Sequence, residues 1–305
     1  MSGEAPRSAP AVSGIVLLDK PVGLSSNAAL QRVRTLYGRV KGGHTGSLDP
    51  LASGMLPICL GEATKIAGEL LAQRKAYRCT VQLGMRTSTG DAEGEVVATA
   101  PVPALDAVRI EACLARFVGA SRQTPPMYSA LKRDGQPLYR LARQGVEVAR
   151  EPRAIEISEL RLLAWRPTQL DLRVVCSKGT YIRVLAEDLA GALGTCGHLI
   201  ALRREFVDPF ENHRLWTLEQ LADPEARHAA LLAADQGVPQ FPAVRLDAAA
   251  ALALRQGKVV AGTGAPGAAP GLRLYGPQGE FLGLGQSDAA GVLKVRRLFL
   301  SDCSA

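Results

Sequence analysis

Cysteine is scarce in this sequence of 305 residues, and its placement excludes two common kinds of site. The six cysteines are scattered, and no two of them stand at the C-x-x-C spacing of a zinc ribbon or a thioredoxin-like redox motif. A chain of this length can bury a sizeable core without covalent staples, so we expect no disulfide framework. That expectation fits a reducing compartment.

Long apolar runs are also missing. No segment approaches the ~20 consecutive apolar residues of a membrane-spanning helix, so no membrane partner is expected. The first residues, MSGEAPRSAPAVSG, contain charges and prolines but not the apolar core of a signal peptide. We therefore predict a soluble cytoplasmic protein whose residues 1–13 form a flexible tail.

The sequence has no acidic excess. Lys and Arg number 36 against 29 Asp and Glu, which gives a formal net charge of +7. A moderately basic balance favours a polyanionic partner such as nucleic acid. Hydrophobic residues make up 47% and charged residues 21%, which excludes intrinsic disorder of the whole chain.

The length suggests about two domains, and the composition shifts near residue 240. We predict a main domain over 14–240 and a small β-rich domain over 241–305. Helices interrupt strands irregularly in the main domain, and several strands have the look of hairpins. This order predicts an α+β fold with a mixed or antiparallel central sheet flanked by helices.

The local patterns predict particular elements within this fold. A helix capped by Ser26 or Asn27 is expected within 25–38, and a glycine-rich loop over 41–57. The range 217–238 is expected to be helical with an interruption near Pro224. The other expected helices cover 62–73, 106–118 and 180–194, and the expected strands lie within 14–21, 77–100, 153–167, 169–179 and 198–207.

Residues 42–54, GGHTGSLDPLASG, are the most informative segment. Four glycines allow the backbone to approach a ligand closely, and Pro50 restrains Asp49 to an extended conformation. The segment could present one carboxylate rigidly in a cleft. Taken alone, it fits equally a surface turn with an Asx-type hydrogen bond from Asp49. It is not a phosphate-binding P-loop, because no Gly-Lys-Ser/Thr follows the glycines.

The wider motif GHTGSLDPLASGMLP resembles the catalytic motif of the TruB family of tRNA pseudouridine synthases. Further segments that resemble family motifs follow in family order, so the resemblance covers about residues 13–220. They are LLDKPVGLSS, KAYRCTVQLGMRTSTGDAEG, TPPMYSALKRDGQPLYRLARQG, CSKGTYIRVLAEDLA and GHLIALRREFVDPF. A weaker resemblance links the C-terminal residues to a PUA-like RNA-binding domain.

The resemblance implies a set of site residues around a uridine that is flipped out of the RNA. Asp49 would be the catalytic nucleophile, and Arg183 would pair with it to keep it ionised. Tyr77 would stack on the flipped base and exchange a proton, with Tyr181 and Leu202 forming further walls. His44 would take the place of the flipped base in the RNA stack. For each of these residues, core packing or an ordinary surface position is the alternative interpretation.

The resemblance also implies an interface with the T-arm of tRNA. Residues 124–152 would be an insertion that grips the RNA, and basic side chains would contact its phosphates. The candidates are Lys20, Lys65, Lys132 and Arg143, together with Arg74, Arg133, Arg140, Arg153 and Lys178. No cofactor, metal or obligatory protein partner is implied, and we expect a monomer.

The implied reaction isomerises the T-loop uridine conventionally numbered 55 to pseudouridine. The N1–C1′ bond breaks, the base turns, and C5 joins C1′. Whether Asp49 attacks the sugar, attacks the base or assists elimination stays open. A non-catalytic tRNA-binding or tRNA-folding protein on the same scaffold is the alternative. A hydrolase is disfavoured, because no second acid stands at a convincing spacing from Asp49.

Overall fold

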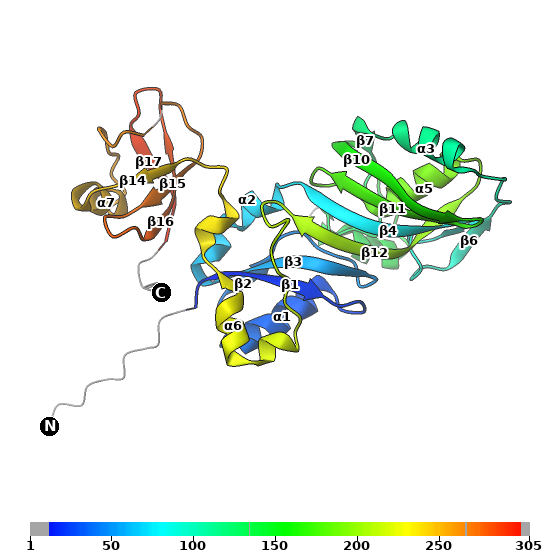
Figure 1. The fold of residues 1–305 in the computed structure, drawn as a ribbon, viewed down its shortest axis with the longest axis horizontal. Coiled ribbons are helices and arrows are strands. Elements are labelled where there is room, and N and C mark those ends of the chain that lie inside the picture. The colour runs from blue at the N-terminus through cyan, green and yellow to red at the C-terminus, as the bar shows by residue number, and fades with distance from the viewer. Residues whose placement is uncertain (1–11, 134, 266, 300–305) are drawn as a thin grey trace.

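The computed structural model describes residues 12–133, 135–265 and 267–299. Its main unit is a nine-stranded sheet in the order β13-β1-β3-β12-β4-β11-β10-β7, with β2 paired to β3 outside this path (Figure 1). Only β12 and β3 run parallel to each other, and the other neighbours in this sheet are antiparallel. The expected α+β fold with a mixed central sheet is confirmed. The strands are β1 Gly14–Lys20, β2 Gly42–His44, β3 Ala52–Leu60, β4 Lys75–Leu83, β7 Gly119–Gln123, β10 Arg153–Arg166, β11 Gln169–Cys176, β12 Gly197–Val207 and β13 Leu231–Leu232.

The helices cover the sheet and bury their apolar stripes against it. In α5, Leu185 and Leu189 recur at helical spacing and lie in the same apolar cluster as Tyr77 and Val81 of β4. The α-helices of this unit are α1 Ser26–Leu36, α2 Ala67–Leu71, α3 Ala107–Ala115, α5 Ile182–Ala192 and α6 Pro224–Ala230. Short 3₁₀ segments are η1 Gly61–Ile66, η2 Gln220–Ala222 and η3 Ala234–Gly237.

Three local predictions are corrected by the structure. The cap of α1 is Ser25, whose hydroxyl accepts from Ala28 N, and not Ser26 or Asn27, because Ser26 is already inside the helix and buried. The helix expected over 62–73 is a 3₁₀ turn followed by the short α2. Pro224 does not interrupt a helix; it opens α6, since proline suits a first helical turn where no N–H is needed.

The loop predicted over 41–57 is also partly wrong, because its second half is the buried strand β3. Gly54 and Pro57 concealed this strand, since both residues usually mark breaks in a strand. Beyond Gly54, β3 pairs with β1 on one side and β2 on the other. The strand therefore lies in the interior of the sheet directly after the Asp49 loop.

Two small hairpins project from the main unit. One is formed by β5 Met85–Thr87 and β6 Val96–Thr99, and the other by β8 Lys132–Arg133 and β9 Gln136–Pro137, which leads into α4 Leu138–Arg143. The second hairpin and α4 belong to the insertion expected over 124–152. None of the helices in the described part of the chain is long and apolar enough to cross a membrane.

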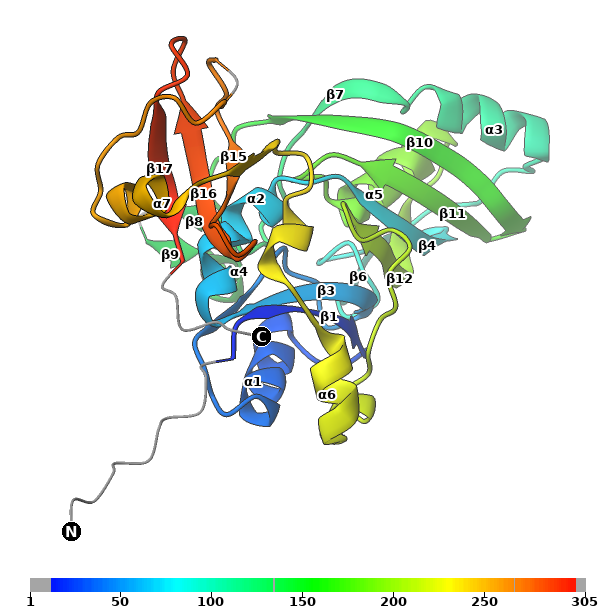
Figure 2. The same ribbon diagram turned by 60° about the vertical axis from the view of Figure 1, so that its left-hand side comes forward.

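The C-terminal residues form a separate four-stranded sheet in the order β14-β15-β16-β17 (Figure 2). Its strands are β14 Ala243–Arg245, β15 Leu272–Tyr275, β16 Phe281–Ser287 and β17 Leu293–Leu298, and helix α7 Ala248–Arg255, which the β-rich prediction missed, packs against them. Leu284 and Phe299 do not pack in the core of this sheet. They lie in an apolar cluster with Ile15, Met55 and Ile66 of the main unit. The two sheets therefore share buried apolar surface.

Candidate active site

Helix α1 fixes the loop that carries Asp49 through hydrogen bonds. The buried Ser26 hydroxyl accepts a hydrogen bond from Leu48 N at 2.7 Å and donates to Leu48 O at 3.0 Å. Gly23 N donates to Pro50 O at 2.8 Å on the other side of the carboxylate. These bonds fix both neighbours of Asp49, so its side chain projects from a restrained backbone.

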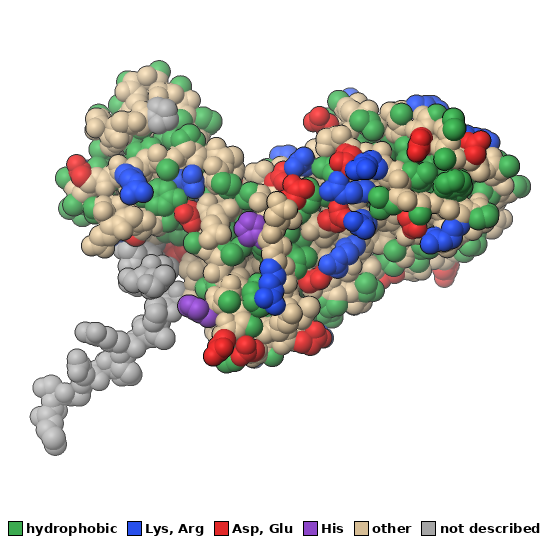
Figure 3. All heavy atoms as spheres, in the orientation of Figure 1, with side chains coloured by type: hydrophobic (Ala, Val, Ile, Leu, Met, Phe, Trp, Pro, Cys, Tyr) green, Lys and Arg blue, Asp and Glu red, His purple; other side chains and the backbone are tan. Residues whose placement is uncertain are grey.

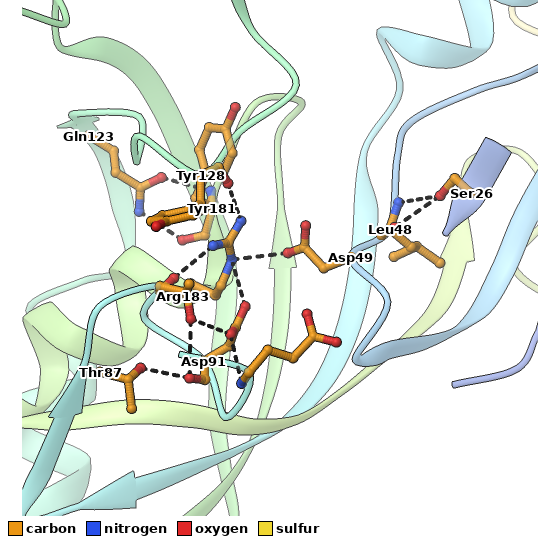
Figure 4. Close-up of polar contacts among 11 residues, drawn as sticks. Ser26, Leu48, Asp49, Thr87, Asp91, Gln123, Tyr128, Tyr181 and Arg183 are labelled. Atoms are coloured by element: carbon orange, nitrogen blue, oxygen red, sulfur yellow. Dashed lines mark hydrogen bonds and ion pairs between the residues drawn. The ribbon is translucent and has the colours of Figure 1, made fainter. Parts of the chain in front are cut away.

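Arg183, at the start of α5, meets the Asp49 carboxylate. The two atoms Arg183 Nε and Asp49 Oδ2 lie 3.0 Å apart (Figure 4). Only 6% of the Arg183 side chain is exposed, against 41% for Asp49, so the acid faces the open side of the pair. The two remaining guanidinium nitrogens donate to Thr89 O and Tyr128 O, each at 2.7 Å. These bonds leave the guanidinium little freedom to turn away.

Asp91 is a second carboxylate on the same arginine, and the sequence reasoning missed it. Its Oδ2 lies 3.5 Å from Arg183 Nε, and its side chain is 4% exposed. Its other oxygen accepts from the Thr89 hydroxyl at 2.6 Å and from Glu93 N at 3.1 Å. The only sequence signal was its place in the polar turn TSTGDAEG, where an Asx-type turn explains an aspartate equally well.

Burial and charge act in opposite directions on Asp49. Burial raises the pKa of Asp49 above its ordinary value, the charge of Arg183 opposes this rise, and Asp91 adds to it. Lys20 of β1 also opposes the rise in the pKa of Asp49. Lys20 is itself fully buried, and burial lowers its pKa to about 8. Its ammonium donates to Pro21 O and Leu24 O, so Lys20 supports the chain beside the site.

Tyr77 and Leu202 lie on the neighbouring strands β4 and β12 and belong to the same apolar cluster. They are 7% and 9% exposed. Burial raises the pKa of Tyr77, while the charge of Arg204 and a hydrogen bond with it oppose the rise. Tyr77 therefore combines an apolar ring surface with a hydroxyl that faces a cation.

Tyr181 directly precedes α5 and is positioned through its backbone. The Gln123 side chain donates to Tyr181 O at 3.1 Å and accepts from Tyr181 N at 2.7 Å. In Figure 4, Tyr181 lies beside Arg183 on the side away from Asp91. The pair of bonds from β7 thus fixes the start of the helix that presents Arg183.

His44 ends β2, just before the Asp49 loop. Burial lowers the pKa of its imidazole, and Arg204 lowers it further. Its Nδ1 and the hydroxyl of the adjacent Thr45 are buried without a hydrogen-bond partner. His44 is therefore neutral near pH 7.

Sequence comparison places these residues in a known family. The description "TruB family pseudouridylate synthase (N terminal domain)" matches residues 34–182, and TruB C-terminal descriptions match 183–236 and 242–299. A curated relative from Aromatoleum aromaticum, named tRNA pseudouridine synthase B, is 51% identical and covers 94% of this chain and 92% of its own. This chain belongs to the TruB family of pseudouridine synthases. A relative of the same name from Methylobacillus flagellatus is 49% identical over 94% of this chain and 95% of its own.

Solved structures support the fold of this TruB family member. The chain matches one in the crystal structure of a Cbf5-Nop10-Gar1 complex with a TM-score of 0.73 and 24% identity, covering 94% of this chain and 85% of that one. A chain in an H/ACA RNP bound to a substrate RNA containing 2′-deoxyuridine gives a TM-score of 0.72 at 21% identity, over 95% and 86% of the two chains. The family assignment confirms that the protein is a pseudouridine synthase.

The basic residues expected at the RNA do not form one cluster in this TruB chain. Lys65 lies at the C-terminal sheet, where its ammonium donates to Leu298 O at 2.6 Å and pairs with Glu62. Arg143 lies on α4 in the insertion, with its guanidinium 5.7 Å from the centre of the Tyr139 ring. The side chain of Lys132 lies outside what the structure describes.

Within residues 12–133, 135–265 and 267–299, no three His, Cys, Asp or Glu side chains gather in a way that could hold a metal ion. The polar side chains that converge at the site are Arg183 and the two carboxylates Asp49 and Asp91. This arrangement suits acid–base and nucleophilic chemistry on an organic substrate.

Proposed function

We propose that this enzyme isomerises the T-loop uridine of tRNA, conventionally numbered 55, to pseudouridine. The relatives that support this assignment are all named tRNA pseudouridine synthase B, at 51%, 49% and 48% identity. The observation that carries the chemistry is the 3.0 Å contact between Asp49 and a buried arginine. A partly buried carboxylate with such a partner can remain an anion.

The reaction needs one anion and no redox partner. The N1–C1′ bond breaks, the base turns, C5 bonds to C1′, and the C5 hydrogen leaves as a proton while N1 gains one. Asp49 supplies the negative charge that meets the electron-poor centre. Arg183 holds that carboxylate in place with a guanidinium that does not deprotonate near neutral pH.

The remaining candidates form the receptor for a flipped nucleotide. A uridine must leave its stack before its glycosidic bond can be reached. Tyr77, Tyr181 and Leu202 supply aromatic and aliphatic walls for the uracil ring. His44, neutral and next to the catalytic loop, occupies the place in the RNA that the base has left. The insertion with Lys132 and Arg143 contacts the T-arm phosphates.

Replacement of Asp49 by asparagine tests this proposal. Asp49→Asn keeps the shape of the side chain but removes its charge, so tRNA binding should persist within about threefold while turnover falls to background. Release of tritium from tRNA labelled at uridine C5 measures turnover, and filter binding measures affinity. Asp171→Asn is the matched control, because Asp171 pairs with Arg166 on the opposite face of the sheet.

The outcomes separate the proposal from the alternative of a tRNA-binding or tRNA-folding protein. An enzyme in which Asp49→Asn retains its rate would require another nucleophile. A wild-type protein that binds tRNA but releases no tritium from C5 would favour the non-catalytic alternative.

A further inference from the structure

Arg204 is a buried cation whose presence the Asp49–Arg183 pair does not explain. It lies on β12 and is 1% exposed. Its Nε and Nη2 donate to backbone carbonyls, and among the described residues it makes no ion pair with a carboxylate. An arginine buried without a counter-charge costs stability. Its contacts must therefore be examined for a role other than stabilising the fold.

The contacts of Arg204 join three parts of the site. Its Nε donates to Met55 O at 2.7 Å on β3, and its Nη2 donates to Gly46 O at 3.0 Å in the loop that leads to Asp49. Across the sheet, Arg204 stands directly opposite Tyr77 in the β12–β4 register. The two side chains therefore lie on the same face of the sheet, and a hydrogen bond with Arg204 is among the influences that lower the pKa of Tyr77. Arg204 thus connects the Asp49 loop to the strand that carries Tyr77.

The chemistry of the two groups fixes the direction of this hydrogen bond. A guanidinium has donors only, so the oxygen of Tyr77 must accept. The hydrogen of the phenol is then free to point to a different acceptor. The positive charge also favours the phenolate and offsets part of the effect of burial on the pKa of Tyr77.

We infer that Arg204 is a positioning residue, which turns the Tyr77 hydroxyl toward the flipped uracil and ties it to the loop that carries Asp49. This inference rests on the proposed function, because it assigns Tyr77 a role in the reaction. It adds a residue that does not touch the substrate and acts through Tyr77. The same contacts would also set the separation between the aspartate and the tyrosine.

A mutant cycle between Arg204 and Tyr77 tests the inference. The single-turnover rate constant would be measured with enzyme in excess over tRNA for wild type, Arg204→Gln, Tyr77→Phe and the double variant. Arg204→Gln should slow the step by about tenfold or more with tRNA affinity unchanged, and should have little further effect when Tyr77 is already Phe. If Arg204→Gln slowed the step by the same factor in the wild type and in Tyr77→Phe, the inference would be wrong. Absence of turnover in the wild type would instead overturn the proposed function.

A spectroscopic readout makes the test independent of activity. Incorporated 3-fluorotyrosine titrates at lower pH than tyrosine, and loss of one ¹⁹F resonance in Tyr77→Phe assigns its signal. In Arg204→Gln the Tyr77 signal should titrate at higher pH than in the wild type, and an unchanged titration would refute the contact. If Arg204→Gln does not fold, the Tyr77 signal is titrated instead in Arg204→Lys, which retains the charge. Arg203→Gln is the matched control, because Arg203 pairs with Asp19 and is 45% exposed.

Discussion

At the scale of single residues, the site depends on one arginine shared between two carboxylates. Asp91 is buried and accepts two further hydrogen bonds, so it holds Arg183 from the protein side. Asp49 meets the same Nε from the open side and keeps its second oxygen available. The buried acid therefore positions the arginine, and the arginine positions the acid that can reach a substrate.

The raised pKa of Asp49 predicts an effect on stability as well as on rate. Its pKa in the folded protein lies above the unfolded value, so the ionised carboxylate costs stability at pH above the folded pKa. This cost disappears as pH falls below the unfolded pKa. Asp49→Asn should therefore unfold at the same or a higher temperature than wild type at pH 7.5, with the difference reduced at acid pH.

Thermal unfolding followed by circular dichroism at both pH values checks this prediction. Asp91→Asn is the comparison, because it removes the buried negative charge that lies 3.5 Å from Arg183 Nε and should lower the unfolding temperature. A lower unfolding temperature for Asp49→Asn at pH 7.5 would show that its pairing with Arg183 outweighs the burial of its charge.

At the scale of elements, the contact between β3 and β12 decides where the Asp49 loop lies. These strands run parallel for three residue pairs, and Gly54 stands opposite Arg204. Gly54 has φ +99°, and a Cβ added there would lie 2.2 Å from Arg204 O. Only glycine satisfies both the backbone angle and the close approach.

Gly54→Ala should consequently destabilise the protein by roughly 2–4 kcal/mol, from backbone strain combined with the clash. Urea denaturation measures this change. Gly119→Ala is the matched control, because Gly119 has φ +106° but open space where the Cβ would stand. If both variants lost the same free energy of unfolding, backbone strain alone would explain the loss. The close contact between β3 and β12 would then make no contribution.

The sequence predicted the elements with strong periodicity and missed those that tertiary contacts create. The helix presenting Arg183 and the strand pair 153–176 follow local patterns. Strand β3 contains Gly54 and Pro57, which only its neighbours in the sheet make compatible with a strand. Pro224 predicts an interruption from its residue type alone, whereas the structure uses it as the first residue of α6.

The sequence predicted those site residues that the family motifs identify. The resemblance named Asp49 and Arg183, and the structure brings them together. Asp91 and Arg204 lie in segments that resemble family motifs, but Arg183 and Tyr77, which they face, are distant from them in sequence. Lys20 is fully buried and Lys65 pairs with Glu62 and Leu298 O, and neither burial nor pairing can be read from charge alone.

At the scale of the whole molecule, the excess positive charge is not spread evenly. Figure 3 shows basic and acidic side chains interspersed over the exposed face of the central sheet. Arg78 and Arg173 both pair with Glu205 across the strands, and Arg173 and Arg161 both pair with Glu159 of β10. Because this face is largely neutralised, we expect the tRNA phosphates to bind elsewhere.

Arg143 of the insertion and Arg78 of the neutralised face provide a matched comparison. Arg143→Ala should weaken tRNA binding and reduce the slope of log affinity against log salt concentration by about 1, as loss of one phosphate contact requires. Arg78→Ala should leave both the affinity and the slope unchanged. Titrations of labelled tRNA at several salt concentrations measure both. A slope that responds to Arg78 instead would place the RNA on the sheet face.

The apolar cluster shared by the two sheets has a consequence for the architecture of the chain. Leu284 and Phe299 complete a core that begins at Ile15, so the last strands of the protein shield some of its first. A protein truncated near residue 240 would expose this apolar surface to water and to other copies of itself. The C-terminal sheet is therefore not an exchangeable module. Removing or replacing it would require redesign of the apolar surface that it covers on the main unit.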